Sequence, residues 1–215
     1  MHETNETQPS LTDTSKAQST TARPVVVGFD LDGVLFFNPF RIVRKPVELL
    51  KKYVLHRKTM LFYIPQSPLE KIFWKLVHMS SLSPAHGWKR IRTLAQNGSI
   101  EAHLITARFA CLKSDFDRCV RSLDGGSYFK TTIHNAHDEQ PHLFKERMIK
   151  ELGIKYYIED NWNIVDHLST HTDATILWIT NAMDLSIDYP ERFNNLDEAM
   201  TRLEALITEE RRSVT

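Results

Sequence analysis

Short apolar runs, rich in Val, Ile, Leu and aromatic residues, recur along the chain and are separated by segments with helical periodicity. The runs cover residues 25–29, 102–106, 128–133, 155–158 and 174–180. The helical segments between them cover residues 84–96, 109–123 and 141–152. Buried strands that alternate with helices are typical of βαβ units. The pattern therefore predicts an α/β fold in which helices flank a parallel sheet.

Two helices carry further local signals. The helix at 141–152 begins with Pro141 and is followed by Gly153, the usual placement of these residue types at helix ends. Near the C-terminus, apolar residues recur at the i, i+3, i+4 and i+7 spacing of one helix face, so we expect a terminal amphipathic helix. These apolar residues are Leu196, Ala199, Met200, Leu203, Leu206 and Ile207.

The segment between the first strand and the strand at 102–106 is, at about seventy residues, far longer than a crossover connection requires. The helical pattern at 84–96 can provide the crossover, which leaves residues 37–83 as an inserted module. Within the module, residues 46–58 and 68–81 have helical patterns, and a short apolar stretch at 60–64 lies between them. We therefore expect a core of residues 23–36 and 84–215 that carries a small helical insertion at 37–83.

Residues 1–22 are rich in Thr, Ser, Gln and Asn and contain few apolar side chains. Such a segment cannot bury enough apolar surface to offset the entropy lost on ordering, so we expect a disordered N-terminal tail. The tail lacks the apolar stretch of a secretory signal, and no later segment reaches the roughly 18 apolar residues of a membrane span. Cys111 and Cys119 are too few for a disulfide framework and lack zinc-ligand spacing. These features indicate a soluble, cytoplasmic protein with reduced thiols.

Charge is unevenly distributed, although the formal net charge of the chain is zero. Residues 41–92 contain twelve Lys or Arg but only two Glu, so this segment carries a net charge of +10 and the rest of the chain carries −10. Such asymmetry concerns binding partners rather than the fold. A basic insertion can attract a phosphorylated ligand, a nucleic acid or an anionic membrane surface.

Two aspartates directly follow the first strand. Asp30 and Asp32 flank one leucine, and Gly33 comes next, where we expect a sharp turn. Asp30 would then lie at the carboxyl edge of the sheet, where open α/β folds bind their ligands. A bend after Asp30 could turn both carboxylates towards one cation. The pair therefore suits a nucleophile, a proton donor and a site for a hard metal ion.

The apolar strand followed by Asp-x-Asp-Gly-Val resembles the first motif of the haloacid dehalogenase-like (HAD) phosphatases. The resemblance implies a Rossmann-like core in which Asp30 is the nucleophile and Asp32 transfers protons. It also implies an inserted helical cap, because family members commonly carry one at the position of residues 37–83. The fold class that we expect is therefore a Rossmann-like, HAD-type α/β core with a small inserted α-helical cap.

The strand at 102–106 ends in Thr106, and Arg108 follows closely. The resemblance implies that Thr106 binds a phosphoryl oxygen together with nearby backbone N–H groups. The Thr-x-Arg sequence resembles the form found in nucleotidase-like members, and a guanidinium at Arg108 could pair with a phosphate through two hydrogen bonds. We therefore expect both residues to bind the substrate, with Thr106 also part of the catalytic set.

A lysine is expected beside the nucleophile, because a carboxylate that attacks a phosphate dianion meets strong charge repulsion. Lysine supplies a compact positive charge that steadies both anions. Lys145 precedes Glu159 by fourteen positions, which matches the helix-then-strand spacing of the family. Lys150, on the same predicted helix, is the competing assignment. The spacing favours Lys145 as the catalytic and substrate-binding lysine.

The apolar run at 155–158 ends in two adjacent acids, Glu159 and Asp160. It resembles the fourth motif of the family, whose acids hold magnesium, and it leaves open whether Glu159 or only Asp160 binds the metal. Carboxylate oxygens suit Mg²⁺, which usually takes one or two protein carboxylates directly. Asn161 and Asp166 are later candidates for hydrogen bonds around the metal, or they mark the start of a helix.

Together, these motifs imply a Mg²⁺-dependent phosphomonoester hydrolase. Asp30 would attack phosphorus and form an aspartyl-phosphate, while Asp32 would protonate the leaving alkoxide and then take a proton from water. Mg²⁺ would be held by Asp30, Asp160 and the main-chain carbonyl of Asp32, with Glu159 as a further candidate. The second aspartate also favours oxygen esters as substrates.

The inserted module would select the small phosphorylated substrate. Its positive charge, its aromatic residues and the Thr-x-Arg sequence favour nucleotides. The aromatic residues in question are Phe62, Tyr63, Phe73, Trp74 and Trp88. One alternative is a phosphatase or phosphomutase that acts on sugar phosphates through the same aspartyl-phosphate. Another is a non-catalytic binding module whose basic insertion docks on nucleic acid or an anionic membrane.

Overall fold

The computed structural model describes residues 23–37, 62–65, 67–78, 83–181, 184 and 186–213. The predicted tail at 1–22 and the predicted helix at 46–58 lie outside these residues, as does the start of the apolar stretch at 60–64. Among the helices that are described, none is long and apolar enough to cross a membrane.

Six parallel strands form the central sheet, in the order β5-β4-β1-β6-β7-β8. Their bounds are β1 Val25–Phe29, β4 Ile100–Phe109, β5 Thr131–Asn135, β6 Tyr156–Glu159, β7 Thr175–Ile179 and β8 Arg192–Phe193. β1 lies between β4 and β6, so Val27 is paired with Ala102 on one side and with Tyr156 on the other. The prediction of an α/β fold with a parallel sheet is confirmed.

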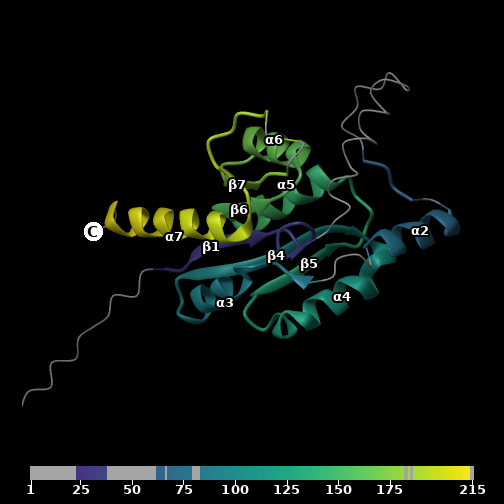
Figure 1. The fold of residues 1–215 in the computed structure, drawn as a ribbon, viewed down its shortest axis with the longest axis horizontal. Helices are drawn as coiled ribbons and strands as arrows, with labels where there is room; N and C mark the ends of the chain where they lie inside the picture. Colours follow the sequence, from purple (N-terminus) through teal and green to yellow (C-terminus); the bar gives the residue numbers. More distant parts are fainter. Residues whose placement is uncertain are drawn as a thin grey trace, which may run out of the picture.

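Helices cover both faces of the sheet (Figure 1). One face carries α3 (Trp88–Gln96), α4 (Lys113–Ser122) and α7 (Leu196–Ser213), and the other carries α5 (Pro141–Leu152) and α6 (Trp162–His171). Successive side chains of β4 point to opposite faces of the sheet, so Leu104 packs with the first set of helices and Ile105 with the second. Each layer thereby has its own apolar core.

Gly28 lets β1 and β6 lie against the second helical layer. A Cβ atom at this position would lie 2.6 Å from Cδ2 of Tyr157 and 2.8 Å from Cδ1 of Ile154. Only glycine avoids these contacts without movement of the Tyr157 ring. The ring is itself fully buried, and its hydroxyl donates to the carbonyl of Ile105 at 3.2 Å.

The strand at 102–106 is longer than its apolar run predicts. It continues as β4 to Phe109, which is buried and pairs with Asn135 of β5. The helix predicted at 109–123 therefore begins later, as a 3₁₀ turn at Ala110–Leu112 followed by α4. Pairing with a neighbouring strand has here overridden the local helical pattern.

Two other predicted bounds also shift. The run at 128–133 forms β5 only from Thr131, because Tyr128 and Phe129 pack their rings into the core, 4.5 Å apart between centroids. The crossover helix predicted at 84–96 begins at Trp88. Ahead of it, Ser83–Pro84 forms the short strand β3, which pairs in antiparallel fashion with β2 (Phe36–Phe37).

The β2–β3 pair brings the two ends of the predicted insertion side by side. The described helix of this segment is α2 (Pro68–His78), within the predicted 68–81. α2 starts with a capping box: Oγ of Ser67 accepts from N of Glu70 at 3.2 Å, and Oε2 of Glu70 accepts from N of Ser67 at 3.0 Å. The division of the chain into core and insertion stays a prediction.

Candidate functional site

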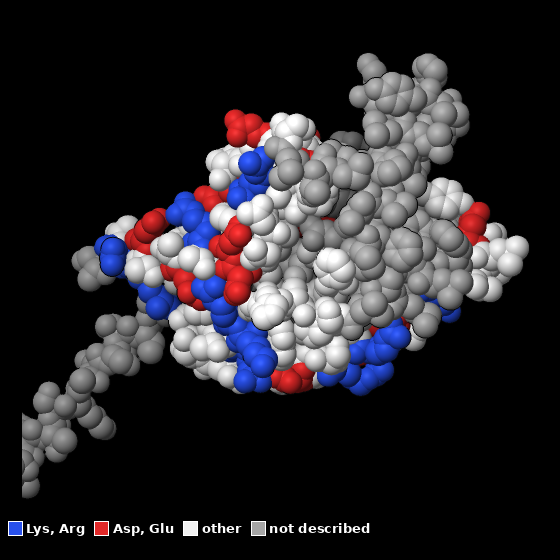
Figure 2. Space-filling view, viewed as in Figure 1, with Lys and Arg blue, Asp and Glu red and all other residues white. Residues whose placement is uncertain are grey.

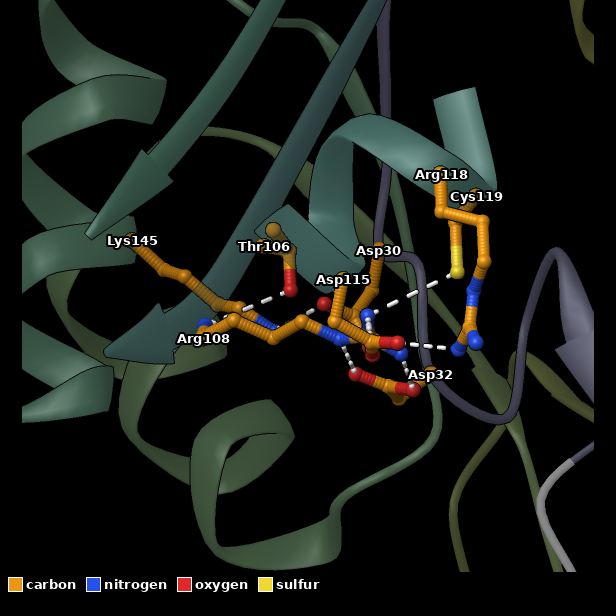
Figure 3. A network of polar contacts seen from close by, with 8 residues as sticks. All are labelled: Asp30, Asp32, Thr106, Arg108, Asp115, Arg118, Cys119 and Lys145. Carbon is orange, nitrogen blue, oxygen red and sulfur yellow. Dashed lines mark hydrogen bonds and ion pairs between the residues drawn. The ribbon is translucent and has the colours of Figure 1, made fainter. Parts of the chain in front are cut away.

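The predicted site residues gather at the carboxyl edge of the three central strands. Asp30 follows β1, Thr106 lies in the last part of β4, and Glu159 ends β6, with Asp160 next in the chain. Lys145 reaches this edge from α5 (Figure 3). Because β1 lies between β4 and β6, one turn and two strand ends meet at the same place. Segments that are distant in the sequence thus form one cluster.

The turn after β1 places Asp30 and Asp32. N of Asp30 still donates to the carbonyl of Ile158 in β6 at 3.0 Å, so Asp30 is held as a continuation of the strand. Gly33 then adopts a φ of +84°, which side chains with a Cβ rarely tolerate, and its N–H donates to the carbonyl of Phe36 at 2.8 Å. The sharp turn predicted at Gly33 is confirmed.

Lys145 lies between two buried carboxylates. Its Nζ atom donates to Oδ1 of Asp30 at 2.7 Å and to Oε2 of Glu159 at 2.5 Å. The same ammonium lies 5.8 Å from the centroid of the Tyr157 ring. Lys145 is only 2% exposed, so its charge is compensated by these anions rather than by water.

The competing lysine lies elsewhere. Lys150 is exposed at the end of α5 and donates to Oε1 of Glu146, one helical turn earlier, at 2.6 Å. Asn161 caps α6, because its Oδ1 accepts from N of Asn163 at 3.1 Å. Asp166 lies exposed on the same helix. The contact of Asn161 matches the helix-start role that the sequence left open for it, whereas Asp166 lies within the helix.

Burial shifts the pKa values of the three central groups. Burial raises the pKa of Asp30 to about 6, with Lys145 opposing the rise and the charges of Asp160 and Asp32 adding to it. Burial likewise raises the pKa of Glu159 to about 8, again against the effect of Lys145. For Lys145, burial alone would lower the pKa, but Asp30 and Glu159 raise it well above its usual value. Near neutral pH the cluster therefore holds a proton on Glu159 in addition to those of the Lys145 ammonium.

This donor set fits a hard divalent cation. Asp30, Glu159 and Asp160 are all buried, and each offers a carboxylate oxygen within 4.8 Å of the other two. Both oxygens of Glu159 are already used, since Oε2 accepts from Lys145 and Oε1 accepts from N of Asp160 at 3.1 Å and N of Asn161 at 3.0 Å. Asp30 and Asp160 remain as carboxylate donors, and two carboxylates suit Mg²⁺.

Arg108 connects Asp32 to a residue that the sequence analysis did not include. Its Nε donates to Oδ2 of Asp32 at 2.8 Å and its Nη2 to Oδ1 at 2.7 Å, while its Nη1 donates to Oδ2 of Asp115 at 2.5 Å (Figure 3). The carboxylate of Asp115 also accepts from Nη2 of Arg118. Burial would lower the pKa of Arg108, but Asp32 and Asp115 raise it overall, so the guanidinium is charged.

Sequence periodicity contains a weak signal for Asp115. The residue shares the buried face of α4 with Phe116 and Cys119, where an acid is unexpected. Buried carboxylates are nearly always paired, so the mismatch points to a partner. Nothing in the sequence identifies that partner as Arg108. Thr106, by contrast, is buried where predicted, and its Oγ1 accepts from N of Arg108 at 3.3 Å.

Two of the basic residues of 41–92 that the structure describes form ion pairs. Arg90 on α3 pairs with Glu204 at 2.9 Å and with Asp197 at 3.3 Å, and Arg92 pairs with Asp124 at 2.5 Å. On the face shown in Figure 2, Lys and Arg accordingly lie among Asp and Glu. Residues 41–58, which contain many of the positive charges, lie outside the described residues.

Solved structures with the same fold are known, although no family model and no curated protein matches the sequence. YfnB from Bacillus subtilis, provisionally described as a HAD-hydrolase and bound to magnesium, is 11% identical with a TM-score of 0.57, and the match covers 85% of this chain and 99% of YfnB. CbbY from Rhodobacter sphaeroides, in complex with phosphate, is 12% identical with a TM-score of 0.53, and the match covers 80% of this chain and 95% of CbbY.

A variant of CbbY was solved with xylulose-(1,5)-bisphosphate. A HAD hydrolase of family IA from Entamoeba histolytica is 13% identical with a TM-score of 0.53, and the match covers 81% of this chain and 94% of that one. Identities this low establish similarity of fold alone. The chain therefore has the Rossmann-like α/β fold of the HAD-superfamily hydrolases.

Proposed function

We propose that this protein is a phosphomonoester hydrolase in which Asp30 is the nucleophile. The observation that carries the proposal is the buried contact of Lys145 with Asp30 and Glu159 at the carboxyl edge of the sheet. A buried, strongly perturbed carboxylate beside a fixed cation is what attack on a phosphate dianion requires. The fold, shared with HAD hydrolases, supports the same reading.

The reaction proceeds in two transfers. A carboxylate oxygen of Asp30 forms a bond to phosphorus while the bond from phosphorus to the leaving oxygen breaks, which gives an aspartyl-phosphate. Asp32 supplies the proton that the leaving alkoxide takes up. Water then attacks the phosphorus, Asp32 accepts its proton, and Asp30 and inorganic phosphate are released. Arg108 donates to both oxygens of Asp32 and so holds this carboxyl group in place for both proton transfers.

In this scheme, Thr106 and Lys145 would hold the phosphoryl group. Thr106 lies at the carboxyl end of β4, beside the turn that carries Asp30, and its hydroxyl can donate to a phosphoryl oxygen. Lys145 keeps its charge at all working pH values, because its pKa is raised by Asp30 and Glu159 despite burial. Its ammonium can therefore offset the repulsion between Asp30 and the phosphate.

Mg²⁺ fits the site as cofactor. Asp30, Asp160 and the main-chain carbonyl of Asp32 would hold it, and Glu159 would mainly fix Lys145, because both oxygens of Glu159 already accept hydrogen bonds. When bound, the ion would neutralise charge on the phosphate and on the acidic cluster. YfnB, which shares the fold, was solved with magnesium.

The substrate class is proposed as small phosphate esters. The sequence-based preference for nucleotides stays a prediction, and Arg108, one of its supports, already contacts two carboxylates. Trp88, another residue that supported this preference, packs beside Tyr128 with 6.2 Å between ring centroids. A sugar phosphate is the second candidate, favoured by the xylulose-(1,5)-bisphosphate complex of CbbY.

The proposal is tested by phosphate release from a panel of sugar phosphates and nucleotides, with Mg²⁺ or with a chelator. We expect Mg²⁺-dependent turnover that Asp30→Asn lowers by roughly 10³-fold or more. Asp117→Asn is the matched control, because Asp117 is a partly exposed acid on α4 that pairs only with Lys113 among the contacts described. Full function in the Asp30→Asn variant, with salt-sensitive binding of nucleic acid or anionic vesicles, would instead support the non-catalytic binding module.

A further inference from the structure

Asp115 is a buried acid that contacts none of the proposed reacting atoms. It lies in the first turn of α4, and its side chain is 10% exposed. Both of its oxygens accept from arginines: Oδ2 from Nη1 of Arg108 at 2.5 Å and Oδ1 from Nη2 of Arg118. A buried charge costs several kcal/mol unless it is well paired. Arg108 and Arg118 supply that pairing, and Arg108 is a residue of the predicted site.

Arg108 links this acid to the proposed proton-transfer group. It holds Asp32 through two nitrogens, Nε at 2.8 Å and Nη2 at 2.7 Å, and it presents a third, Nη1, to Asp115. The guanidinium is planar and rigid, so a two-point contact fixes the plane of the Asp32 carboxylate. Both oxygens of Asp32 accept from Arg108, so the orientation of this carboxyl group follows that of the guanidinium.

The chain of contacts is thus Asp115, Arg108, Asp32, and Figure 3 shows the three side chains in sequence beside Asp30. Asp115 holds the Nη1 side of Arg108 while Nε and Nη2 hold Asp32, so loss of Asp115 would remove one of the contacts that fix the plane of the guanidinium. The guanidinium could then turn away from the plane that it now shares with Asp32. An outer carboxylate that orients an inner group is a common arrangement at catalytic sites.

We propose that Asp115 is a positioning residue that acts through Arg108 to aim Asp32 at the leaving oxygen of the substrate. The inference rests on the proposed function, since it assigns Asp115 a role in the transfer of a proton by Asp32. It adds to the predicted site a residue from α4, a helix that carries none of the predicted catalytic groups.

The leaving group of the substrate provides the test. An alkoxide needs its proton as the bond breaks, whereas p-nitrophenolate departs without one. In Asp115→Asn we therefore expect kcat/KM to fall about 10-fold or more for an alkyl phosphate and less than about 2-fold for p-nitrophenyl phosphate. Asp117→Asn, on the same helix and partly exposed, should leave both values unchanged. Equal losses on both substrates would show a merely structural role and overturn the proposal.

A second variant covers the case in which Asp115→Asn does not fold. Arg108→Lys keeps the positive charge but cannot hold Asp32 at two points, so it should show the same loss confined to alkyl phosphates. If Arg108→Lys folds and loses activity equally on both esters, or on neither, the proposal is wrong. If the wild-type protein hydrolyses no phosphate ester at all, the proposed function itself fails, and this inference fails with it.

Discussion

Nζ of Lys145 lies 2.7 Å from Oδ1 of Asp30, although 115 positions separate the two residues in the chain. The contact is buried and includes Glu159 as a second anion. Removal of the cation would leave two buried carboxylates facing each other and Asp160. The stability of the fold and the chemistry of the site therefore depend on the same ammonium group.

We expect Lys145→Met to abolish phosphate release and to destabilise the metal-free protein by about 3–5 kcal/mol at neutral pH, because it leaves buried charges unpaired. Lys150→Met on the same helix removes an exposed pair with Glu146 and should cost less than about 1 kcal/mol. Urea unfolding of both variants gives the comparison. Similar losses of unfolding free energy in the two variants would contradict the buried pairing of Lys145 with Asp30 and Glu159.

The stability of the metal-free protein should fall as pH rises from 7 to 8. Burial raises the pKa of Glu159 from 4.5 to about 8, so the folded protein binds its proton more tightly than the unfolded chain does. The stabilisation from this proton is complete below the unfolded pKa and is lost as pH rises through the folded one, with a slope of at most about 1.4 kcal/mol per pH unit.

Other titrating groups do not obscure the effect of Glu159 on stability between pH 7 and 8. The rise in the pKa of Asp30, to about 6, acts mainly at lower pH. The lowered pKa values of His103, His134 and His142, caused chiefly by burial, act in the opposite direction and only below about 6.5. Urea unfolding with a chelator at pH 7 and 8 measures the effect. Glu159→Gln should remove the decline, and an unchanged slope in that variant would exclude Glu159 as its source.

Binding of Mg²⁺ should release a proton at pH 7 but not at pH 9. At pH 7 the pKa of about 8 keeps Glu159 largely protonated, and a cation beside the cluster favours the ionised form. At pH 9 Asp30 and Glu159 are both ionised before the ion arrives. Titration calorimetry in two buffers of different ionisation enthalpy reports the proton. Equal release at both pH values would contradict the raised pKa values.

Gly28→Ala should destabilise the fold by about 1–3 kcal/mol, because its Cβ would overlap the buried Tyr157 ring at 2.6 Å. Thermal unfolding measures the loss. Since Tyr157 also lies beside Lys145, we expect lower phosphatase activity in the folded fraction of the variant. If Gly28→Ala were as stable as the wild-type protein, the strands would be able to move apart at this point without cost.

Most of the sheet could be predicted from local pattern. The apolar runs correspond to β1, β4, β5, β6 and β7 because buried parallel strands need apolar side chains on both faces. Their bounds were less predictable. Phe109 lies in β4 rather than in a helix because it pairs with Asn135, a partner that no local pattern identifies.

The sequence by itself determined that Asp30, Thr106 and Asp160 stand at the ends of apolar runs, and the motif spacing of the family that it resembles added Lys145 as a fourth candidate for one site. Only the tertiary structure decided their partners. It paired Glu159 with Lys145 and brought Asp115 to Arg108, and Arg108 to Asp32. The physical reason is that burial follows local apolar periodicity, whereas a buried charge is paired by whichever opposite charge the packing of distant segments brings within reach.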